Sequence, residues 1–401
     1  MSKISYEEAL NKLQNLNITT RTKKVFIIDS LDEILAQDIK AQTNSPAYPT
    51  AAMDGYAINI SSNPSNKEFK IVDYSPAGSV VDTQVNDNVC IKTFTGSLMP
   101  KGSDTLVPIE NIKLLENNTI SITQEVPCGF AVMRVGENYE KNEILIPKGS
   151  KIDFAQIGVM ASLNIVFVEV YDSPVIGICS TGSEILDIGE ESTNVSQIRS
   201  SNHLTIQAIA HKYGCNTKLL GLIKDDKTSI LNAISNGLNC CDIVVTTGGV
   251  SVGDYDFVKD IVIDQLGAEV VFQGVEIKPG QHIIVAQLGN KFICALPGFA
   301  YSSTVTFLLF CLPVIFKYRG NYEKLNIINA IASNQFHNPT SKTVFTASNI
   351  SYQDGSYYVD TRNKKIGTSA ILTNLLGNSV LAISEPKSFI DSNQSIKTII
   401  L

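Results

Sequence analysis

The 401-residue chain lacks the sequence features that mark nucleic-acid-binding, secreted and membrane-spanning proteins. Its formal net charge is -7, so it offers no basic field for nucleic acid, and any anionic ligand must be held by a local site. The start, MSKISYEEALNKLQ, has no apolar run of the kind that a signal peptide needs. No stretch reaches about 18 uninterrupted apolar residues, and the longest, STVTFLLFCLPVIF, contains Pro313 and is more typical of a buried helix. We therefore expect a soluble cytoplasmic protein that binds neither nucleic acid nor a membrane.

Cysteine and histidine are also poor candidates for metal ligands here. The eight cysteines include no CxxC pair, and most lie in apolar surroundings, which predicts core residues in a reducing compartment. The four histidines are scattered along the chain. If a metal binds, we expect oxygen ligands. We also find no convincing Ser/His/Asp or Cys/His constellation, which argues against a protein nucleophile.

The pattern of apolar and polar residues changes several times along the chain, and the length of the chain predicts two to four domains. Ser5 followed by Glu8 is a capping box, so the chain should open with a helix. From about residue 45 to 170, short alternating runs predict mainly strand. From 174 to about 317 strands alternate with helices, which predicts a mostly parallel sheet with right-handed crossovers. After Gly320, short strands predict a small β-barrel or sandwich.

Three loops follow strands of the predicted parallel sheet: STGSEI, TTGGVSVGDYD and LPGFAYSS. In an open α/β sheet, ligands bind beyond the carboxyl ends of the strands. Each loop has a glycine, which lets the backbone approach a ligand closely, and hydroxyl residues that can donate to an anion. One such loop would only indicate a tight turn, but three favour an anionic, phosphorylated ligand. None matches the Walker or dinucleotide fingerprint.

Carboxylates stand among these anion loops, at Glu184 in the first loop and at Asp254 and Asp256 in the second. A carboxylate beside phosphate oxygens is unfavourable unless a cation lies between them, and magnesium prefers oxygen ligands together with substrate phosphates. The alternative is that these acids cap a helix N-terminus, where the helix dipole favours negative charge. Both interpretations stay open for Asp254.

Five segments, in this order and spacing, resemble the molybdopterin molybdenumtransferase family, which is related to the E domain of gephyrin. The segments are SPAYPTAAMDGYAI, TFTGSLMPKGSDTLVPIE, STGSEI, VVTTGGVSVGDYDFVKD and IKPGQHIIV with KFICALPG. The likeness covers essentially the whole chain. It implies an enzyme that inserts molybdate into adenylylated molybdopterin and releases AMP with magnesium assisting.

The resemblance also implies a fold class of α/β and mainly-β domains: a molybdopterin adenylyltransferase-like α/β domain with a mostly parallel sheet, an inserted β domain, an elongated linker domain and a C-terminal β-barrel. The expected boundaries are residues 1–24 for an N-terminal helix, 25–45 with 140–172 for the linker, 46–139 for the inserted domain, 173–320 for the α/β domain and 321–401 for the barrel. The family implies a homodimer with its active cleft between subunits, and molybdopterin adenylyltransferase and molybdoenzyme apoproteins as expected partners.

Site residues are carried over from the family position by position. The implied catalytic residues are Asp54, Thr95, Glu184, Asp256 and Lys278, of which Asp54 and Thr95 with Gly96 would come from the partner subunit. The implied metal ligands are Glu184, Asp225 or Asp226, and Asp256. The implied pterin, phosphate and oxyanion contacts are Gly96, Thr181, Gly182, Gly248, Gly249, Ser251, Pro297, Gly298 and Ser369.

Each of the less obvious assignments has a plainer structural alternative. Asp54 can cap a turn, and Thr95 can be an ordinary residue of a strand-to-turn segment. Lys278 before Pro279 has the context of a surface lysine, and Ser369 that of a turn residue.

The sequence departs from the family pattern at its expected site. The last loop reads LPGFA where the family has LPGNP, so Phe299 and Ala300 replace an amide and a proline. Gln281 replaces a lysine, which removes one positive charge from the anion site, while Ser200 and Asn138 replace acids. These changes leave two alternatives beside the molybdate-inserting enzyme: a tungstate-preferring or weakly active paralogue, and a non-catalytic pterin-binding scaffold. An enzyme for another nucleotide-linked substrate is a further alternative.

Overall fold

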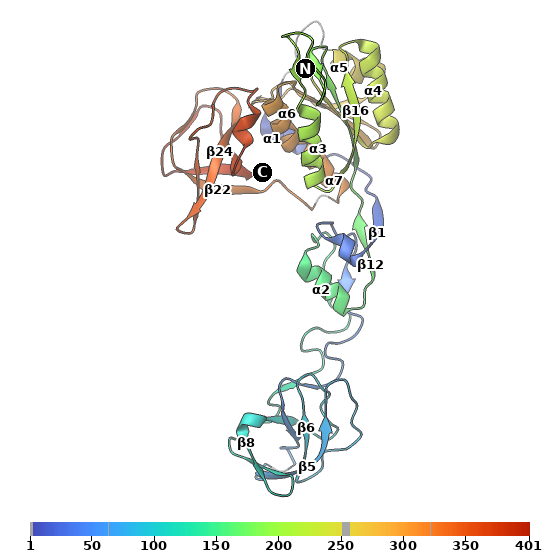
Figure 1. The fold of residues 1–401 in the computed structure, drawn as a ribbon, viewed down its shortest axis with the longest axis vertical. Coiled ribbons are helices and arrows are strands. Elements are labelled where there is room, and N and C mark those ends of the chain that lie inside the picture. The colour runs from blue at the N-terminus through green and yellow to red at the C-terminus, as the bar shows by residue number, and fades with distance from the viewer. Residues whose placement is uncertain (1–2, 63, 251–256, 321) are drawn as a thin grey trace. The chain divides into compact units, whose positions relative to one another are not determined.

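The computed structural model describes residues 3–62, 64–250, 257–320 and 322–401. The chain divides into two compact units (Figure 1). The first unit consists of Met1–Ala36, Gly149–Asp153 and Phe167–Leu401, and the second of Gln37–Lys148 and Phe154–Val166. The four-domain boundaries expected from the sequence remain a prediction.

A six-stranded sheet forms the centre of the first unit, in the strand order β16-β13-β17-β21-β20-β18. The strands are β13 (Val175–Thr181), β16 (Asn216–Ile223), β17 (Ile243–Thr247), β18 (Glu269–Gln273), β20 (Ile284–Leu288) and β21 (Lys291–Leu296). The first four in the spatial order pair in parallel, and β20 and β18 add an antiparallel edge. The expected mostly parallel sheet is confirmed, as is the hairpin that turns at Gly289 and Asn290.

Helices cover both faces of this sheet because its central strands are apolar on both sides. Their buried residues alternate: Ile243 and Val245 pack with one cluster, and Val244 packs with the other. On the first face lie α1 (Tyr6–Gln14), α3 (Asn202–Lys212), α6 (Ala300–Thr306) and α7 (Leu312–Tyr318). On the second lie α4 (Lys227–Cys240), α5 (Phe257–Asp260) and η3 (Ile261–Gln265), and Figure 1 shows this division.

The first helix begins where the capping box predicts, since the Ser5 side chain accepts a hydrogen bond from the Glu8 backbone N–H. The apolar segment that contains Pro313 is helical throughout, as α6, η4 (Phe307–Cys311) and α7. This stretch, Ala300–Tyr318, has the length and composition of a membrane span, yet 83% of its most apolar window is buried. It is therefore a core helix, as the sequence predicts.

A closed barrel lies at the C-terminal end of the first unit. Strands β24 (Thr343–Gln353), β25 (Ser356–Asp360), β22 (Ile327–Ala332), β28 (Ser395–Ile400) and β26 (Ser379–Ser384) follow one another around the ring. Pairing of β24 with β26 closes it, which confirms the expected barrel. A short strand of the α/β region, β19 (Ile277–Lys278), pairs in parallel with β24. The remaining elements here are β23 (Phe336–Asn338), β27 (Ser388–Ile390) and η5 (Leu372–Leu375).

A two-stranded antiparallel ribbon completes the first unit. Strand β1 (Thr22–Phe26) pairs with β12 (Phe167–Tyr171), and η1 (Ile27–Ser30) follows β1. The rings of Phe26 and Phe167 contact each other edge to face, with centroids 6.0 Å apart, although both side chains are exposed.

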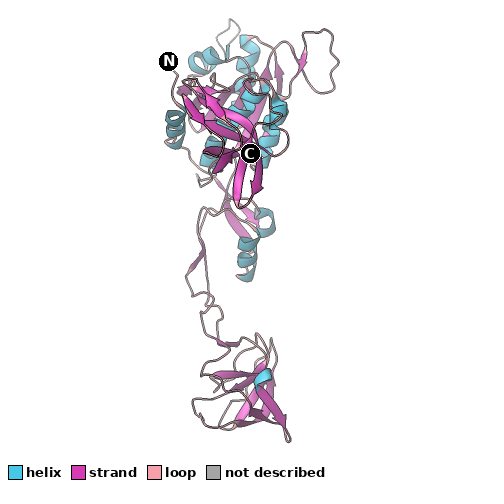
Figure 2. Ribbon diagram, turned by 90° about the vertical axis from the view of Figure 1, so that its left-hand side faces the viewer, coloured by secondary structure: helices cyan, strands magenta, loops and turns pink. Residues whose placement is uncertain are grey.

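The second unit is mainly β, as expected for an inserted domain (Figure 2). Its six-stranded sheet has the order β7-β4-β6-β5-β9-β8. These strands are β4 (Gly55–Ile58), β5 (Glu68–Ser75), β6 (Val89–Thr93), β7 (Thr105–Pro108), β8 (Ile112–Leu115) and β9 (Thr119–Ile122). The unit also contains β2 (Ile39–Lys40), β3 (Thr50–Ala51), β10 (Val132–Met133), β11 (Ile144–Ile146), η2 (Ile109–Asn111) and α2 (Phe154–Ser162).

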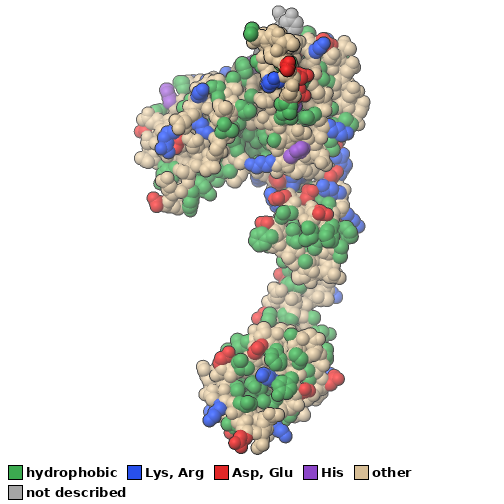
Figure 3. Space-filling view, viewed as in Figure 1, with side chains coloured by type: hydrophobic (Ala, Val, Ile, Leu, Met, Phe, Trp, Pro, Cys, Tyr) green, Lys and Arg blue, Asp and Glu red, His purple; other side chains and the backbone are tan. Residues whose placement is uncertain are grey.

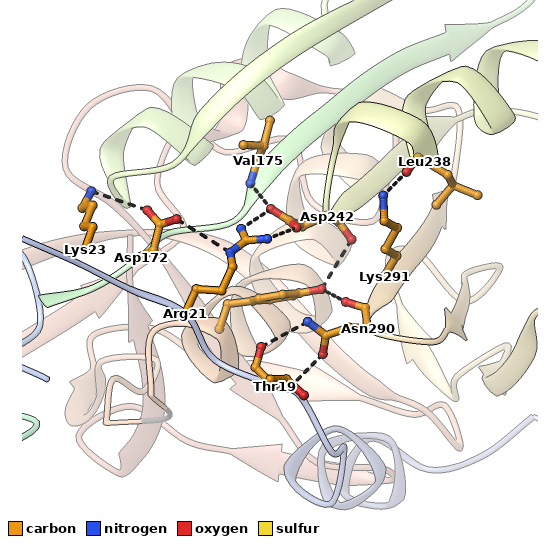
Figure 4. A network of polar contacts seen from close by, with 10 residues as sticks. Thr19, Arg21, Lys23, Asp172, Val175, Leu238, Asp242, Asn290 and Lys291 are labelled. Carbon is orange, nitrogen blue, oxygen red and sulfur yellow. Dashed lines mark hydrogen bonds and ion pairs between the residues drawn. The ribbon is translucent and has the colours of Figure 1, made fainter.

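A polar network closes the N-terminal ends of the parallel strands (Figure 4). Both guanidinium Nη atoms of Arg21 donate to the Asp242 carboxylate at 2.8 Å, and the Val175 N–H donates to the same group at 2.8 Å. Burial alone would raise the pKa of Asp242, but these hydrogen bonds outweigh it and hold the pKa below its ordinary value. Asn290 bonds the Thr19 backbone in both directions. The segment before β1 is thereby fastened to the starts of β13 and β17.

Candidate functional site

Three glycine-containing loops meet at the carboxyl edge of the sheet. Strands β13, β17 and β21 are parallel neighbours, so the loops that follow them are adjacent. The Gly248 N–H donates to the Leu296 carbonyl at 3.0 Å, and the hydroxyls of Ser180 and Thr247 lie 2.8 Å apart. The loops predicted from the sequence to bind an anion therefore form one continuous surface.

The second loop requires glycine because its backbone passes close to its neighbours. Gly248 has a φ of +97°, and a Cβ there would stand 2.7 Å from the Thr181 carbonyl oxygen. Gly249 has a φ of +68°, and its Cβ would stand 2.8 Å from Val258 Cγ2. Any larger residue would push the loop out of place.

A cavity of about 830 Å³ opens over these loops. It gathers nine of the residues carried over from the family: Thr181, Glu184, Asp225, Gly248, Gly249, Lys278, Pro297, Gly298 and Ser369. Its volume falls within the range of pockets that hold a small-molecule ligand. Gly182 lies between Thr181 and Glu184 in the first loop, while Ser251 and Asp256 lie outside the described residues.

Two carboxylates stand on the cavity wall. A Cβ on Gly182 would come within 2.8 Å of Glu184 Oε2, so the Glu184 carboxylate folds back over its own loop. Among the described residues, no hydrogen bond or ion pair engages that carboxylate. Asp225 lines the same cavity, whereas Asp226 caps α4 by accepting a hydrogen bond from the Ser229 N–H at 2.8 Å. Of the two alternatives at this position, Asp225 is the one on the cavity wall.

The positive side of the cavity includes a lysine that the sequence did not suggest. Lys278 lines the cavity, and two further lysines contact the Gln281 side chain. Lys342 Nζ donates to Gln281 Oε1 at 2.6 Å, and Lys3 Nζ donates to the same oxygen at 3.1 Å. Lys342 also lines the cavity, and the β19–β24 pairing brings it there. The loss of one charge at Gln281 relative to the family pattern stays a prediction. Sequence reasoning missed Lys342, because SKTVF carries no motif.

The barrel makes a second contribution at Ser369. Its carbonyl accepts hydrogen bonds from the Ser302 N–H at 3.1 Å and from Ser302 Oγ at 3.3 Å, which ties the barrel to the start of α6. Phe299 lines the cavity beside this junction with its side chain exposed. A bulky apolar residue thus lines the ligand space where the sequence reads LPGFA.

The residues expected from a partner subunit lie in the second unit. Asp54 Oδ1 accepts hydrogen bonds from the Thr95 N–H at 2.8 Å and from Thr95 Oγ1 at 2.7 Å. The backbone and then the hydroxyl of Thr95 hold the pKa of the Asp54 carboxyl below its ordinary value. Gly96 follows with a φ of +77° and open space where a Cβ would stand. Asn138 lies in this unit as well, bonded to Ser45.

The structure brings together one Ser/His/Asp group, although the sequence offered no convincing constellation of this kind. Ser200 Oγ lies 3.1 Å from His203 Nδ1, and His203 Nε2 lies 3.3 Å from Asp187 Oδ1. Ser200 lines the cavity. The signal in the sequence was weak, because the three residues match no known spacing and Ser200 was noticed only as a departure.

Two family descriptions match the chain. The "MoeA N-terminal region (domain I and II)" matches residues 4–164, and the "Probable molybdopterin binding domain" matches residues 177–317. A molybdopterin molybdenumtransferase of Staphylococcus aureus strain COL is 32% identical over 317 residues, which cover 78% of this chain and 75% of the relative. That of Haemophilus influenzae is 28% identical over 360 residues, covering 89% of this chain and 87% of the relative.

A solved structure has the same architecture. The molybdopterin biosynthesis moeA protein from Pyrococcus horikoshii OT3 superposes with a TM-score of 0.83 at 26% identity, over the full length of both chains. The fold and the matched domains thus define a multidomain protein of α/β and mainly-β modules, built as in the moeA protein. The chain belongs to the molybdopterin molybdenumtransferase family, which consists of transferases of molybdenum cofactor biosynthesis.

Proposed function

We propose that this chain transfers molybdenum from molybdate to molybdopterin that arrives in its adenylylated form, with AMP as the leaving product. The observation that carries the proposal is the cavity at the carboxyl edge of the sheet, where glycine loops, lysines and carboxylates face one space. A ligand with a pyrophosphate link suits this mixture, since the glycine loops and lysines accept its phosphates. Family membership favours this transferase over a non-catalytic scaffold or an enzyme for another nucleotide-linked substrate.

Magnesium is the proposed cation of the site, and the donor chemistry fits it. Glu184 and Asp225 offer carboxylate oxygens on one wall, and Glu184 is unpaired among the described residues. No group of three or more His, Cys, Asp or Glu side chains forms a complete metal site within those residues. Two carboxylates together with ligand phosphates are the arrangement in which magnesium is commonly bound. When bound, magnesium would neutralise charge on the pyrophosphate as AMP leaves.

The chain's own residues would mainly bind and orient. Lys278 and Lys342 would hold the tetrahedral oxyanion, with Gln281 setting the position of the Lys342 ammonium. The backbone N–H of Gly249 would hold a phosphate oxygen, so that positioning accounts for much of the rate. Asp256 remains a predicted magnesium ligand, and Ser251 a predicted ligand contact. Molybdate is the proposed oxyanion, with tungstate as the competitor to compare.

We also propose a homodimer. Hydrophobic side chains reach the surface of both units (Figure 3), and the ribbon of β1 and β12 exposes Phe26 by 43% and Phe167 by 62%. Apart from one bridge between Val170 and Leu35, these two strands pair only with each other in the described chain, and a two-stranded sheet is marginal in water. A second copy would cover the ribbon and supply Asp54, Thr95 and Gly96. Phe167→Glu should then shift the sedimentation behaviour from dimer to monomer, and an unchanged dimer would contradict this interface.

The place of the reaction in the cell is part of the same proposal. We propose a cytoplasmic enzyme that receives its ligand from a molybdopterin adenylyltransferase and delivers product to molybdoenzyme apoproteins. The free cysteines suit a reducing compartment. Pull-down of a purified adenylyltransferase by the purified chain tests the first handover, and no association at micromolar concentrations would count against it.

The proposed reaction is tested by AMP release. Purified protein is incubated with adenylylated molybdopterin, and AMP is measured with molybdate and magnesium, with either one omitted, and with tungstate in place of molybdate. We expect release that needs both the oxyanion and magnesium. Tight binding of the ligand without AMP release would contradict the proposal.

A further inference from the structure

Ser200, His203 and Asp187 lie in a line of close polar contacts that begins at the wall of the cavity. Ser200 stands just before α3, His203 is in its first turn, and Asp187 follows the short strand β14 (Ile185–Leu186). Ser200 is 7% exposed and His203 is 4% exposed, whereas about half of the Asp187 side chain is exposed. β14 pairs in parallel with β15 (Ile198–Arg199), which holds Asp187 and Ser200 near each other.

The Asp187 carboxylate faces the imidazole of His203, with Oδ1 3.3 Å from Nε2. A carboxylate only accepts, so this contact favours the tautomer that carries its hydrogen on Nε2. In that tautomer Nδ1 has a lone pair, to which the Ser200 hydroxyl donates across 3.1 Å. The remaining lone pairs of Ser200 Oγ are left to the cavity that Ser200 lines. A hydroxyl bonded to a base that a third group orients is the arrangement of an activated nucleophile.

The surroundings indicate which electrophile such a nucleophile would meet. Asn202 Nδ2 donates to the Gly298 carbonyl at 2.7 Å, which ties the start of α3 to the third glycine loop. The first turn of α3, whose free N–H groups favour an anion, therefore adjoins the loops that suit phosphate. A phosphorus atom bound there would lie beside Ser200.

We propose that Ser200 is a catalytic nucleophile toward the phosphorus of a phosphoanhydride, with His203 as its general base and Asp187 as a positioning residue. Ser200 Oγ forms a bond to phosphorus while the bond from phosphorus to the leaving phosphate oxygen breaks, and the hydroxyl proton moves to His203 Nδ1. Water then attacks the same phosphorus and loses one proton to the departed phosphate oxyanion, the bond to Ser200 Oγ breaks, and the imidazolium returns its proton to that oxygen. That the phosphorus belongs to the AMP group rests on the proposed function, whereas the reactivity of Ser200 does not.

An alkyl fluorophosphonate tests the reactivity without the pterin ligand. Ser200 Oγ would displace fluoride, and mass spectrometry of the intact protein and its peptides would locate the adduct. We expect labelling at Ser200 that is lost in Ser200→Ala and slowed about 100-fold or more in His203→Gln, because general-base catalysis contributes on that scale. Asp187→Asn should slow labelling about fivefold at most, since a half-exposed ion pair contributes little. Thermal melting of each variant checks that it is folded.

The matched control is Ser201→Ala, since in the described chain no histidine bonds to the Ser201 side chain, and its labelling should equal that of the wild type. Absence of an adduct at Ser200 in folded wild-type protein would overturn the proposal, as would labelling that is equally fast in the folded His203→Gln variant. AMP release by wild-type protein without an adduct would reject this inference alone. An adduct without AMP release would reject the proposed function alone.

Discussion

Among the described residues, charged side chains are paired at one end of the parallel strands β13, β17 and β21, and two at the other end are left unpaired. At the N-terminal end, Arg21 and Asp242 pair at 2.8 Å, and the start of β13 donates to the same carboxylate (Figure 4). At the carboxyl end, the Glu184 carboxylate and the Lys278 ammonium line one cavity, and neither is engaged by another described residue. Charges that are paired within the fold stabilise it, whereas charges left facing a cavity are available to a ligand.

This difference assigns stability to one end of the sheet and ligand binding to the other. Variants at the carboxyl end should change activity with little effect on unfolding. Variants at the N-terminal end should do the reverse. Substitutions made at each end in turn test whether ligand binding and stability depend on different ends of the sheet.

The largest effect is expected from Glu184→Gln. The substitution keeps the shape of the side chain and removes the charge that would hold magnesium, so AMP release should fall about 100-fold or more. The unfolding midpoint in urea should not change, because the Glu184 carboxylate has no hydrogen-bond partner in the described chain. Glu191→Gln is the matched control, since Glu191 is exposed and absent from the cavity wall. Full activity in Glu184→Gln would contradict the assignment.

Gly248→Ala should have the next largest effect. The new Cβ would stand 2.7 Å from the Thr181 carbonyl at a φ of +97°, so the loop must move and affinity for the adenylylated ligand should fall about tenfold or more. Isothermal titration measures that affinity. Gly289→Ala controls for backbone strain alone, because Gly289 has a φ of +60° with no atom within 4 Å of its Cβ position. Equal losses of affinity in both variants would show that the close approach is irrelevant.

Asp242→Asn should destabilise the fold by about 2 kcal/mol in urea unfolding and leave ligand affinity unchanged. The Asp242 carboxylate is mostly buried and accepts three charge-assisted or backbone hydrogen bonds. Asp172→Asn is the comparison, because its contacts with Arg21 and Lys23 are at 3.7 and 3.8 Å and more exposed. That variant should lose less than about 1 kcal/mol. A loss of ligand affinity in folded Asp242→Asn protein would show that the N-terminal end of the sheet also affects ligand binding.

A smaller effect is expected from pH. Because the pKa of Asp242 is lowered on folding, its contribution to stability is complete above the ordinary aspartate pKa of about 3.9. The contribution is lost as the pH falls through the lowered value. Unfolding measured below about pH 4 should therefore bring wild type and Asp242→Asn closer in stability. A difference that stays constant down to about pH 2.5 would rule out this ionisation as the cause.

The sequence predicts which loops lie at the carboxyl end of the sheet, but not every side chain that they place in the cavity. Loops after apolar strands, the glycine of Gly248 and the acid Glu184 are local features, so their positions at the sheet edge follow from the strand pattern. The choice between Asp225 and Asp226 cannot be made from the strand pattern, because it depends on which of the two carboxylates caps α4.

Other parts of the site depend on contacts between distant segments. Lys342 reaches Gln281 only because a strand of the barrel pairs with β19, and no periodicity indicates that pairing. The line of Ser200, His203 and Asp187 depends on side-chain orientation and on the short β14–β15 pair. The predicted roles of Asp256 and Ser251 lie outside the described residues.

Transfer of molybdenum at the carboxyl-edge cavity, coupled to the departure of AMP, is the central proposal for this protein. The most direct measurement follows both products together: molybdenum bound to the pterin, by elemental mass spectrometry, and AMP, by chromatography, in wild type and Glu184→Gln. We expect equal amounts of the two in wild type, with both lost in the variant. AMP without bound molybdenum, or unchanged yields of both in Glu184→Gln, would contradict the proposal.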